Sequence, residues 1–175
     1  MMNSREIVSR TLTYDRPERI ARSFWCSDLM GVVYTTKTYA TEWVEVGGGA
    51  WEHLDEWGNT WRRLDSTSKG EVAKGVLDDL EAADHYEFPD FSQPEDYLKA
   101  AQTRNENPDK WVMGRLPGFA FNIARKLRRL DNYLADILID HPRISALHDR
   151  IDSLLQDMIR NYAAIGVDSI FFPED

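Results

Sequence analysis

Apolar residues recur at three- and four-residue steps through the last third of the chain, which is the spacing of one face of a helix. The pattern begins after Pro142, a residue suited to a first helical turn because no backbone N–H is needed there, and it stops at Gly166. The opposite face carries Arg, Asp and Gln. We therefore predict a long helix with one buried face, formed by Ile144, Leu147, Ile151, Leu154, Leu155, Met158, Ile159 and Tyr162.

Shorter helices are predicted from capping residues and from prolines. Asn3 followed by Glu6 has the spacing of a capping box, in which two side chains satisfy free N–H groups at a helix start. Prolines mark the points where helices end. The predicted helices cover residues 4–12, residues from 97 to before Pro108, residues 119–127, and residues from Asp131 or Asn132 to Ile139.

Strands are predicted where short apolar runs lie between turn-forming residues. Alternation of polar and apolar residues from Trp51 to Val72 indicates a hairpin or a pair of short strands. Residues 29–50 fit either extended chain or helix, and both alternatives stay open. The runs predicted as single strands are residues 19–25, 110–114 and 167–172.

The order strand, helices, strand from residue 110 to residue 172 is a β-α-β unit, whose two strands lie parallel. We therefore predict the α/β class. A parallel sheet needs cover on both faces, yet only three or four strands are predicted, so part of the sheet must be exposed, closed by a partner, or absent from this chain. A length of 175 residues fits one domain, predicted over residues 1–175.

The charge of the chain bears on its partners. Thirty acidic and 21 basic residues give a net charge of −9, which repels a phosphate backbone, so nucleic acid is not expected as a partner. The local exception is the basic run Arg125-Lys126-Leu-Arg128-Arg129. Such a run either attracts anions or forms the solvated face of a helix, and the second case is the commoner one.

Other classes are excluded by what the chain lacks. No apolar run approaches the roughly 18 residues that span a bilayer, and the first residues lack the apolar stretch of a secretory signal, so we expect a cytoplasmic protein. The single cysteine, Cys26, excludes an internal disulfide and, without a second soft ligand, a structural zinc site. We assign no metal, because no metal-ligand spacing joins His53, His85, His141 and His148.

Five motifs follow one another along the chain: Asn3-Ser-Arg-Glu-Ile-Val-Ser-Arg-Thr-Leu12, Arg16-Pro-Glu-Arg19, Asp55-Glu-Trp-Gly-Asn-Thr-Trp61, Gly114-Arg-Leu-Pro-Gly-Phe119 and Ala164-Ile-Gly-Val-Asp-Ser-Ile170. As an ordered set they resemble the amino-terminal half of the uroporphyrinogen decarboxylase superfamily, which includes the cobamide-dependent methyltransferases. The resemblance implies half of a (β/α)8 TIM barrel with long crossover helices, ending after its fourth strand. We expect such a truncated half to be inactive alone.

The resemblance favours the methyltransferase branch. True decarboxylases carry an Arg-Gln-Ala-Gly-Arg loop after the first strand, where this chain has Cys26-Ser-Asp28, while Asp55-Glu-Trp-Gly58 and the final Glu-Asp resemble the methyltransferases. Uroporphyrinogen decarboxylation in porphyrin biosynthesis is the alternative. A methyltransferase relative requires zinc and a cobamide, with the His and Cys zinc ligands in the second half of the barrel, so no cofactor is expected in this chain.

Site residues are also implied by the resemblance. Glu174 and Asp175 would follow a barrel strand at its carboxyl end, where barrel active sites lie, and are the predicted catalytic residues; a disordered acidic end is the alternative. Arg115 lies in a loop before a helix and suits a carboxylate or phosphate, unless it is an ordinary surface arginine. The predicted substrate-binding residues are Asp28, Asp55, Trp57, Arg115 and Phe119. For Asp55 the alternative, and the commoner case, is an exposed carboxylate of a hairpin.

The expected ligands and partners follow from the same features. Four of the six tryptophans lie between Trp43 and Trp61, and they form either the wall of a tetrapyrrole pocket or ordinary packing in a core or interface. A small-molecule or tetrapyrrole ligand is therefore expected. Exposed sheet edges also predict assembly with a second copy of the chain or with a separately encoded carboxyl half, or a non-catalytic half barrel.

Overall fold

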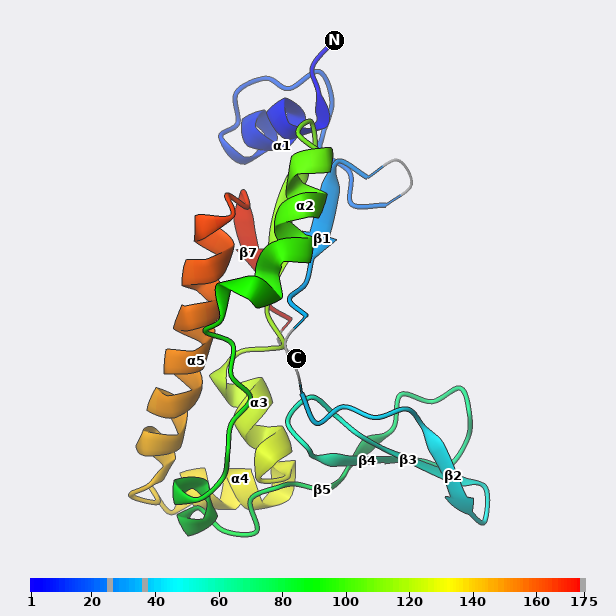
Figure 1. The fold of residues 1–175 in the computed structure, drawn as a ribbon, viewed down its shortest axis with the longest axis vertical. Coiled ribbons are helices and arrows are strands. Elements are labelled where there is room, and N and C mark those ends of the chain that lie inside the picture. The colour runs from blue at the N-terminus through cyan, green and yellow to red at the C-terminus, as the bar shows by residue number, and fades with distance from the viewer. Residues whose placement is uncertain (25–26, 36–37, 174–175) are drawn as a thin grey trace. The chain divides into compact units, whose positions relative to one another are not determined.

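The computed structural model describes residues 1–24, 27–35 and 38–173. The chain forms two compact units (Figure 1). The first contains Met1–Thr36, Phe91–Pro117 and Leu155–Pro173, and the second contains Lys37–Asp90 and Gly118–Leu154. The single partial domain predicted over residues 1–175 stays a prediction.

A three-stranded parallel sheet forms the centre of the first unit. Its strands are β1 (Leu29–Val32), β6 (Trp111–Arg115) and β7 (Ser169–Phe171), in the order β1-β6-β7. β6 pairs in parallel with both neighbours. The strands predicted over residues 110–114 and 167–172 are therefore confirmed, as are their parallel arrangement and the mixed α/β class. No closed barrel is formed by the described residues, so the half barrel stays a proposal.

The strand predicted over residues 19–25 is wrong in its described part. Residues 19–24 form no strand, and β1 begins only after Asp28. Ile20 and Phe24, whose apolar character suggested a buried strand, are 76% and 72% exposed. The described residues thus supply three parallel strands, and a fourth, implied by the resemblance, is absent from them.

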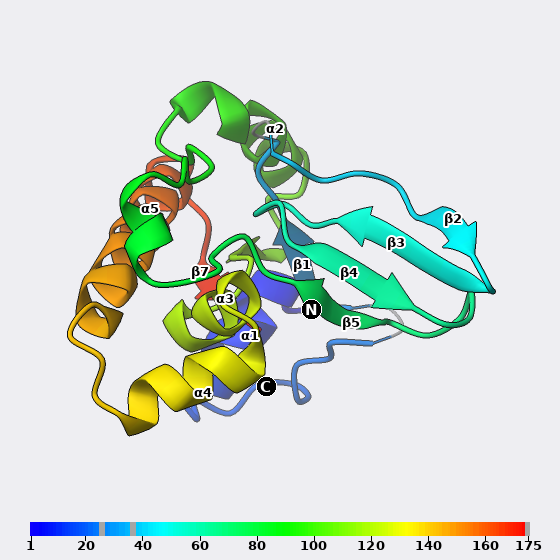
Figure 2. The same cartoon turned by 90° about the horizontal axis from the view of Figure 1, so that it is seen from below.

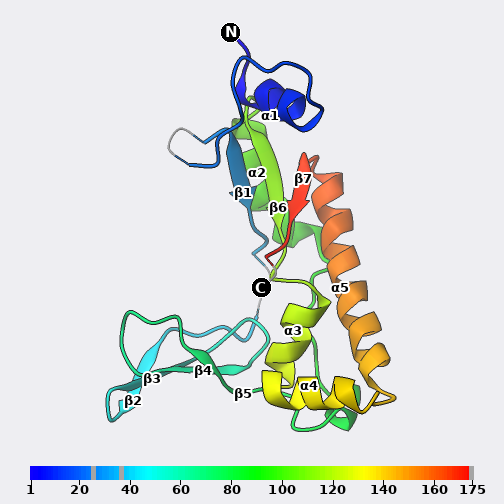
Figure 3. The same cartoon turned by 180° about the vertical axis from the view of Figure 1, so that it is seen from behind.

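Helices cover one face of this sheet. The short 3-10 helix η2 (Pro94–Tyr97) leads into α2 (Leu98–Glu106), and α5 (Ile144–Ala164) contributes its carboxyl-terminal half. Tyr162 packs directly on β6, because a Cβ placed on Gly114 would lie 2.5 Å from the Tyr162 ring. Seen from behind in Figure 3, the opposite face of the three strands carries no helix of this unit.

The buried face of α5 confirms the predicted pattern. Within the predicted stripe, the fully buried side chains follow steps of four and three residues, and the helix ends before Gly166, whose φ of +76° suits glycine. Ile159 departs from the pattern and is 39% exposed. The fully buried members are Leu147, Ile151, Leu155, Met158 and Tyr162.

The helix α1 (Ser4–Leu12) covers the amino ends of all three parallel strands. It was predicted over the same residues, and the Asn3 side chain caps it by accepting the N–H of Glu6 at 2.9 Å. Asp28 and Asp168 directly precede β1 and β7, and Asp109 lies two residues before β6. The N-cap residue and the first two residues of the helix contact these three aspartates. The contacts are Asn3 to Asp109 (3.0 Å), Ser4 to Asp28 (2.7 Å) and an ion pair from Arg5 to Asp168.

Asp28 is the most strongly bound of these aspartates. It is 1% exposed and accepts hydrogen bonds from both terminal nitrogens of Arg19 (2.5 and 2.7 Å). The Ser4 hydroxyl and the backbone N–H of Arg22 (2.9 Å) occupy its remaining acceptor positions. These bonds, above all those from Arg19, outweigh burial and hold the pKa of Asp28 well below its ordinary value of 3.8.

The second unit is built on a four-stranded antiparallel meander (Figure 2). Its strand order is β2-β3-β4-β5, so each strand pairs with the next one in the chain. The pairing of β3 with β4 confirms the predicted hairpin, and β2 shows that part of the open region 29–50 is extended. The strands are β2 (Val44–Gly47), β3 (Ala50–Leu54), β4 (Thr60–Arg63) and β5 (Glu71–Lys74).

The second unit also contains helices α3 and α4, the short helix η1 (Glu81–Asp84) and the amino-terminal half of α5. α3 (Ala120–Leu127) and α4 (Leu130–Leu138) confirm the two helices predicted there. The predicted cap of α4 is wrong. Its N-cap residue is Arg129, at a φ of +61° and without a side-chain cap bond, because the two helices are joined by only a very short connection.

The end of α3 is held against the chain that follows β5. The N–H of Leu77 donates to the carbonyl oxygen of Leu127 at 2.9 Å. Gly75 permits this approach, since a Cβ there would lie 2.2 Å from the same oxygen. Arg128 is paired with Asp136 at 2.8 Å and also donates to the carbonyl oxygen of Leu77. The sheet and the two helices are thereby fixed relative to each other inside this unit.

We predict that Asp28→Asn destabilises the protein by about 3 kcal/mol at neutral pH, because it leaves the Arg19 charge without its buried partner. Asp15→Asn is the matched control, since Asp15 is exposed and lies 3.9 Å from Arg10, a pair that contributes under about 1 kcal/mol. Urea denaturation followed by circular dichroism measures both. If both variants lost the same small amount of unfolding free energy, the pair between Arg19 and Asp28 would not contribute to stability.

The same substitution has a defined pH dependence. Because the folded-state pKa of Asp28 lies below 3.8, its contribution is complete above that pH and is lost as the pH falls below it. The stability difference between wild type and Asp28→Asn should therefore stay constant near neutrality and narrow once the pH is below 3.8. A difference that is independent of pH in the acid range would contradict this assignment.

Candidate functional site

The predicted ligand-binding arginine, Arg115, lies on the bare face of the parallel sheet. It is the last residue of β6, so it stands at the carboxyl end of the sheet. Its side chain lies close to Gly31 of β1, where a Cβ would lie 2.8 Å from it, and its guanidinium carbon is 5.5 Å from the centre of the Phe171 ring on β7. The arginine is exposed. Its position agrees with the expected location, while its role in binding stays a prediction.

Phe119 lies in the second unit and not in the first. It is the N-cap residue of α3 and is 47% exposed, and its carbonyl oxygen accepts the N–H of Ile123 at 3.0 Å. Arg115 and Phe119 therefore belong to different units, although the sequence places them on one loop. The predicted joint use of these two residues in substrate binding stays a prediction.

Asp28 stands at the amino end of β1, whereas the prediction placed it after a first strand, at a carboxyl end. The misplaced strand over residues 19–25 explains this difference. Its carboxylate is occupied by Arg19, Ser4 and Arg22, which gives it a structural role. Its predicted contact with a substrate stays a prediction.

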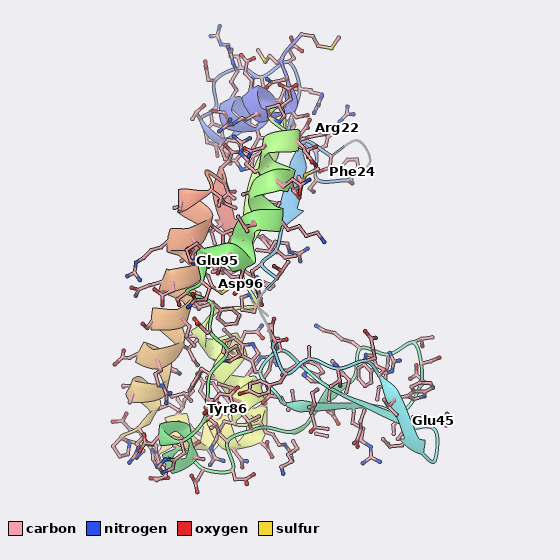
Figure 4. All side chains as sticks on the ribbon, in the orientation of Figure 1. Arg22, Phe24, Glu45, Tyr86, Glu95 and Asp96 are labelled. Atoms are coloured by element: carbon pink, nitrogen blue, oxygen red, sulfur yellow. The ribbon has the colours of Figure 1, made fainter. Side chains whose placement is uncertain are left out.

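Asp55 and Trp57 shape the turn between β3 and β4. Asp55 Oδ1 accepts the backbone N–H groups of Trp57 and Asn59, both at 2.9 Å, and Oδ2 accepts the indole N–H of Trp61 at 2.8 Å. Trp57 is 1% exposed, and its carbonyl oxygen accepts the hydroxyl of Tyr86, labelled in Figure 4, at 2.5 Å. Both residues thus stabilise the turn, and their predicted contact with a substrate stays a prediction.

The tryptophan-rich segment packs mainly on itself. Trp43 lies 4.1 Å from the ring centre of His53, and the guanidinium carbon of Arg63 lies 4.1 Å above Trp43 and 5.6 Å from Trp51. Together with the buried Trp57, these contacts are the ordinary packing that was the alternative to a tetrapyrrole wall. Trp61 differs, because it also lines a cavity.

That cavity is a cleft of about 670 Å³ in the second unit. β4, β5 and the loop between them form one side, and α3, the start of α4 and their connection form the other. The lining residues are Trp61, Lys69, Gly70, Glu71, Val72, Arg125, Lys126, Arg129, Leu130, Asp131 and Leu134. Four of them are cationic and two are anionic, in a chain whose net charge is −9.

Lys126 has the most unusual environment in the cleft. It is half-buried, and its Nζ lies 5.9 Å from the ring centre of Trp61. Burial lowers the pKa of Lys126 below its ordinary value of 10.5, the carboxylates of Asp55 and Glu56 act in the opposite direction, and Arg125 reinforces the lowering. A partly desolvated ammonium group next to an aromatic ring can contact an anionic or a π-rich ligand.

Sequence reasoning found this cleft only in part. The basic run from Arg125 to Arg129 was noted as an anion attractor or a solvated helix face, and the structure shows that Arg125, Lys126 and Arg128 are half-buried. The sequence did not indicate that Lys69 or the apolar residues of α4 line the cleft. They are brought together with α3 only by the packing of the meander against the helices. The predicted catalytic residues Glu174 and Asp175, and also Cys26, lie outside the described residues.

Comparison with known proteins places the chain in no family: no family model, curated protein or solved structure matches it. Across the part of the chain that the structure describes, no helix is both long and apolar enough to cross a membrane. The same residues contain no group of three or more His, Cys, Asp or Glu side chains arranged to hold a metal ion.

We predict that Asp55→Ala destabilises the second unit by about 2 kcal/mol, because several donors lose an ionised acceptor. The exposed Glu45 on β2, labelled in Figure 4, gives the matched control Glu45→Ala, with an expected change within about 0.5 kcal/mol. Urea denaturation measures the loss, and the indole N–H signal of Trp61 in a nitrogen-15 NMR spectrum should move in Asp55→Ala only. An unmoved Trp61 signal would contradict the assigned turn.

Proposed function

We propose that the chain is the amino-terminal half of a (β/α)8 barrel similar to the uroporphyrinogen decarboxylase superfamily, on the side of its cobamide-dependent methyltransferases. The single observation that carries the proposal is the winding of the parallel sheet. Its strands follow one another in chain order, and the helices of the first unit cover one face only.

The order of the strands and the side on which the helices lie distinguish two kinds of parallel sheet. In a doubly wound sheet the strand order reverses at a switch point and helices cover both faces. In a barrel each strand lies next to the one before it, and every helix lies outside. The order β1-β6-β7, with α2 and α5 on the same face, fits the second arrangement.

The bare face would then be the barrel interior. The residues that share it alternate along each strand, and the indole N–H of Trp111 donates to Ser169 on the neighbouring strand at 2.9 Å. Large side chains typically fill such an interior. The face carries Leu29, Gly31, Trp111, Met113, Arg115, Ser169 and Phe171.

Arg115 stands at the carboxyl end of this face, where barrel active sites are built. We assign it the binding of an anionic group of the ligand, through charge-assisted hydrogen bonds. Glu174 and Asp175 follow β7 in the sequence, and their proposed part in catalysis rests on the resemblance alone. The proposal keeps the expected cytoplasmic location.

A methyltransferase of this kind would need zinc and a cobamide. The described residues do not fit zinc, because they offer no cluster of three or more metal-ligating side chains. The proposal therefore places the zinc ligands in a carboxyl-terminal half, as the resemblance implies, and we derive no chemical step through the metal. This chain would supply the ligand-facing wall around Arg115.

We predict that the chain retains hydroxocobalamin saturably in equilibrium dialysis, with the phosphodiester of the cobamide as the anionic group that Arg115 contacts, and that it retains uroporphyrin more weakly. Arg115→Gln should weaken retention about tenfold, the loss expected for one charge-assisted hydrogen bond. The matched control is Arg160→Gln, because Arg160 is exposed on α5 and pairs with Asp157 and Gln156 on its own helix. Retention of uroporphyrin instead would favour the decarboxylase alternative.

A catalytic assay can contradict the proposal that the chain is an incomplete barrel. The chain alone is expected to transfer no methyl group from methylcobalamin to a thiol and to leave uroporphyrinogen unchanged. Turnover by the chain alone would overturn the assignment to an incomplete barrel. In the dialysis experiment, failure of the chain to retain either hydroxocobalamin or uroporphyrin would contradict the proposed relation to the cobamide-dependent methyltransferases.

A second candidate function is a non-catalytic half barrel that pairs with another copy of the chain. The observation that favours it is that β1 and β7 are the outer strands of the described sheet and that one face of this sheet is bare. Two such halves could cover each other. The same surfaces would serve a separately encoded carboxyl half.

We predict for this candidate that light scattering gives twice the mass of one chain at high concentration and that Met113→Glu abolishes the dimer, since Met113 lies on the bare face. Leu98→Glu is the matched control, because Leu98 is 66% exposed on α2, on the covered side of the sheet. A monomer at every concentration would reject self-assembly.

A further inference from the structure

The cleft of the second unit is independent of the proposed barrel. All of its lining residues belong to one unit, so it needs neither the parallel sheet nor a carboxyl-terminal half. Its volume of about 670 Å³ lies within the range of roughly 300–1,000 Å³ that is usual for small-molecule sites. Nothing in the proposed function uses it.

The walls of the cleft are held by specific contacts. The last turn of α3 is bound to the segment after β5 through the bond from Leu77 to Leu127, and the Gly75 backbone fits against it. On the opposite wall, the Trp61 indole is oriented by Asp55 at 2.8 Å. Lys126 and Trp61 thus face a common space from two fixed elements.

The charges of the cleft select an anion. Arg129 already lies 3.4 Å from Asp131, so its charge is partly compensated within the cleft. Lys126 is half-buried, and no carboxylate of the described residues pairs with it at ion-pair distance. Lys69 on the strand side adds to the positive potential. A negatively charged group that reaches Lys126 would restore part of the solvation that burial removes.

The apolar part of the lining selects a flat body. Trp61 presents an aromatic ring next to Lys126, and Leu130 and Leu134 are 45% and 43% exposed on the helical side. Burying these surfaces against an apolar ligand is favourable by roughly 25 cal/mol per Å². A simple inorganic anion would leave them in water.

We propose that this cleft binds a small organic anion, namely a carboxylate or phosphate carried on a flat apolar body. Lys126 contacts the anionic group, and Trp61 and Leu134 flank the body. A carboxylate and a phosphate would both be recognised by the positive charge of Lys126. Comparing the affinities of the matched probes 2-naphthoate and 2-naphthyl phosphate distinguishes the two groups.

Nitrogen-15 NMR on the full chain tests the proposal, because each tryptophan gives its own indole signal and Trp61→Phe identifies that of Trp61. Titration with 2-naphthoate or 2-naphthyl phosphate should move the Trp61 signal saturably. The neutral 2-naphthamide and inorganic phosphate should each bind at least tenfold more weakly, because each lacks one half of the recognition. Equal binding of 2-naphthamide would overturn the role of charge.

Variants of Lys126 locate the anion contact. Lys126→Gln should weaken 2-naphthoate about tenfold, and Lys126→Arg should keep the affinity within about threefold, because it keeps the charge. Lys74→Gln is the matched control: Lys74 lies on β5 and does not line the cleft. Unmoved Trp43 and Trp51 signals verify that each variant is folded. No saturable shift, or equal losses in Lys126→Gln and Lys74→Gln, would overturn the proposal.

Discussion

Three aspartates at the amino ends of three parallel strands determine how the first unit is built. A carboxylate that leaves water must be paired or hydrogen-bonded, and this applies to Asp28 and Asp168, whose side chains are buried, whereas Asp109 is exposed. Each of the three accepts a contact from one of three consecutive residues at the start of α1, and Asp28 is bound in addition by Arg19. One short helix therefore ties together strands that are far apart in the sequence. It also contacts the amino end of the sheet, whereas Arg115 stands at the carboxyl end.

The second constraint is the close contact between β6 and α5. Tyr162 lies on Gly114, and its hydroxyl donates to the carbonyl oxygen of Arg115 at 2.9 Å. A side chain at position 114 would displace the helix, so the sheet can accept α5 on this face only because the residue is glycine. The covered face is thereby fixed, and the other remains available for a barrel interior or for a partner.

The sequence predicted those elements whose signal is local. The stripe on α5, the capping residue Asn3 and the alternation after Trp51 all reflect contacts within one element or between neighbouring elements. The first strand was misplaced because Ile20 and Phe24 have strand-like character but lie exposed, while Arg19 pairs with Asp28. That pair depends on tertiary structure. The cleft was only partly visible for the same reason: its basic run is continuous in the sequence, whereas Trp61 reaches it through the fold.

The central claim is that the start of α1 organises the whole parallel sheet, and hydrogen exchange tests it most directly. The measurement compares the wild type with a variant in which Asn3, Ser4 and Arg5 are all alanine, and Arg10→Gln, which lies on the same helix, serves as the control. The account predicts that backbone amides of β1, β6 and β7 lose protection together in the triple variant, while those of α3 keep theirs. Loss of protection confined to α1 would contradict it.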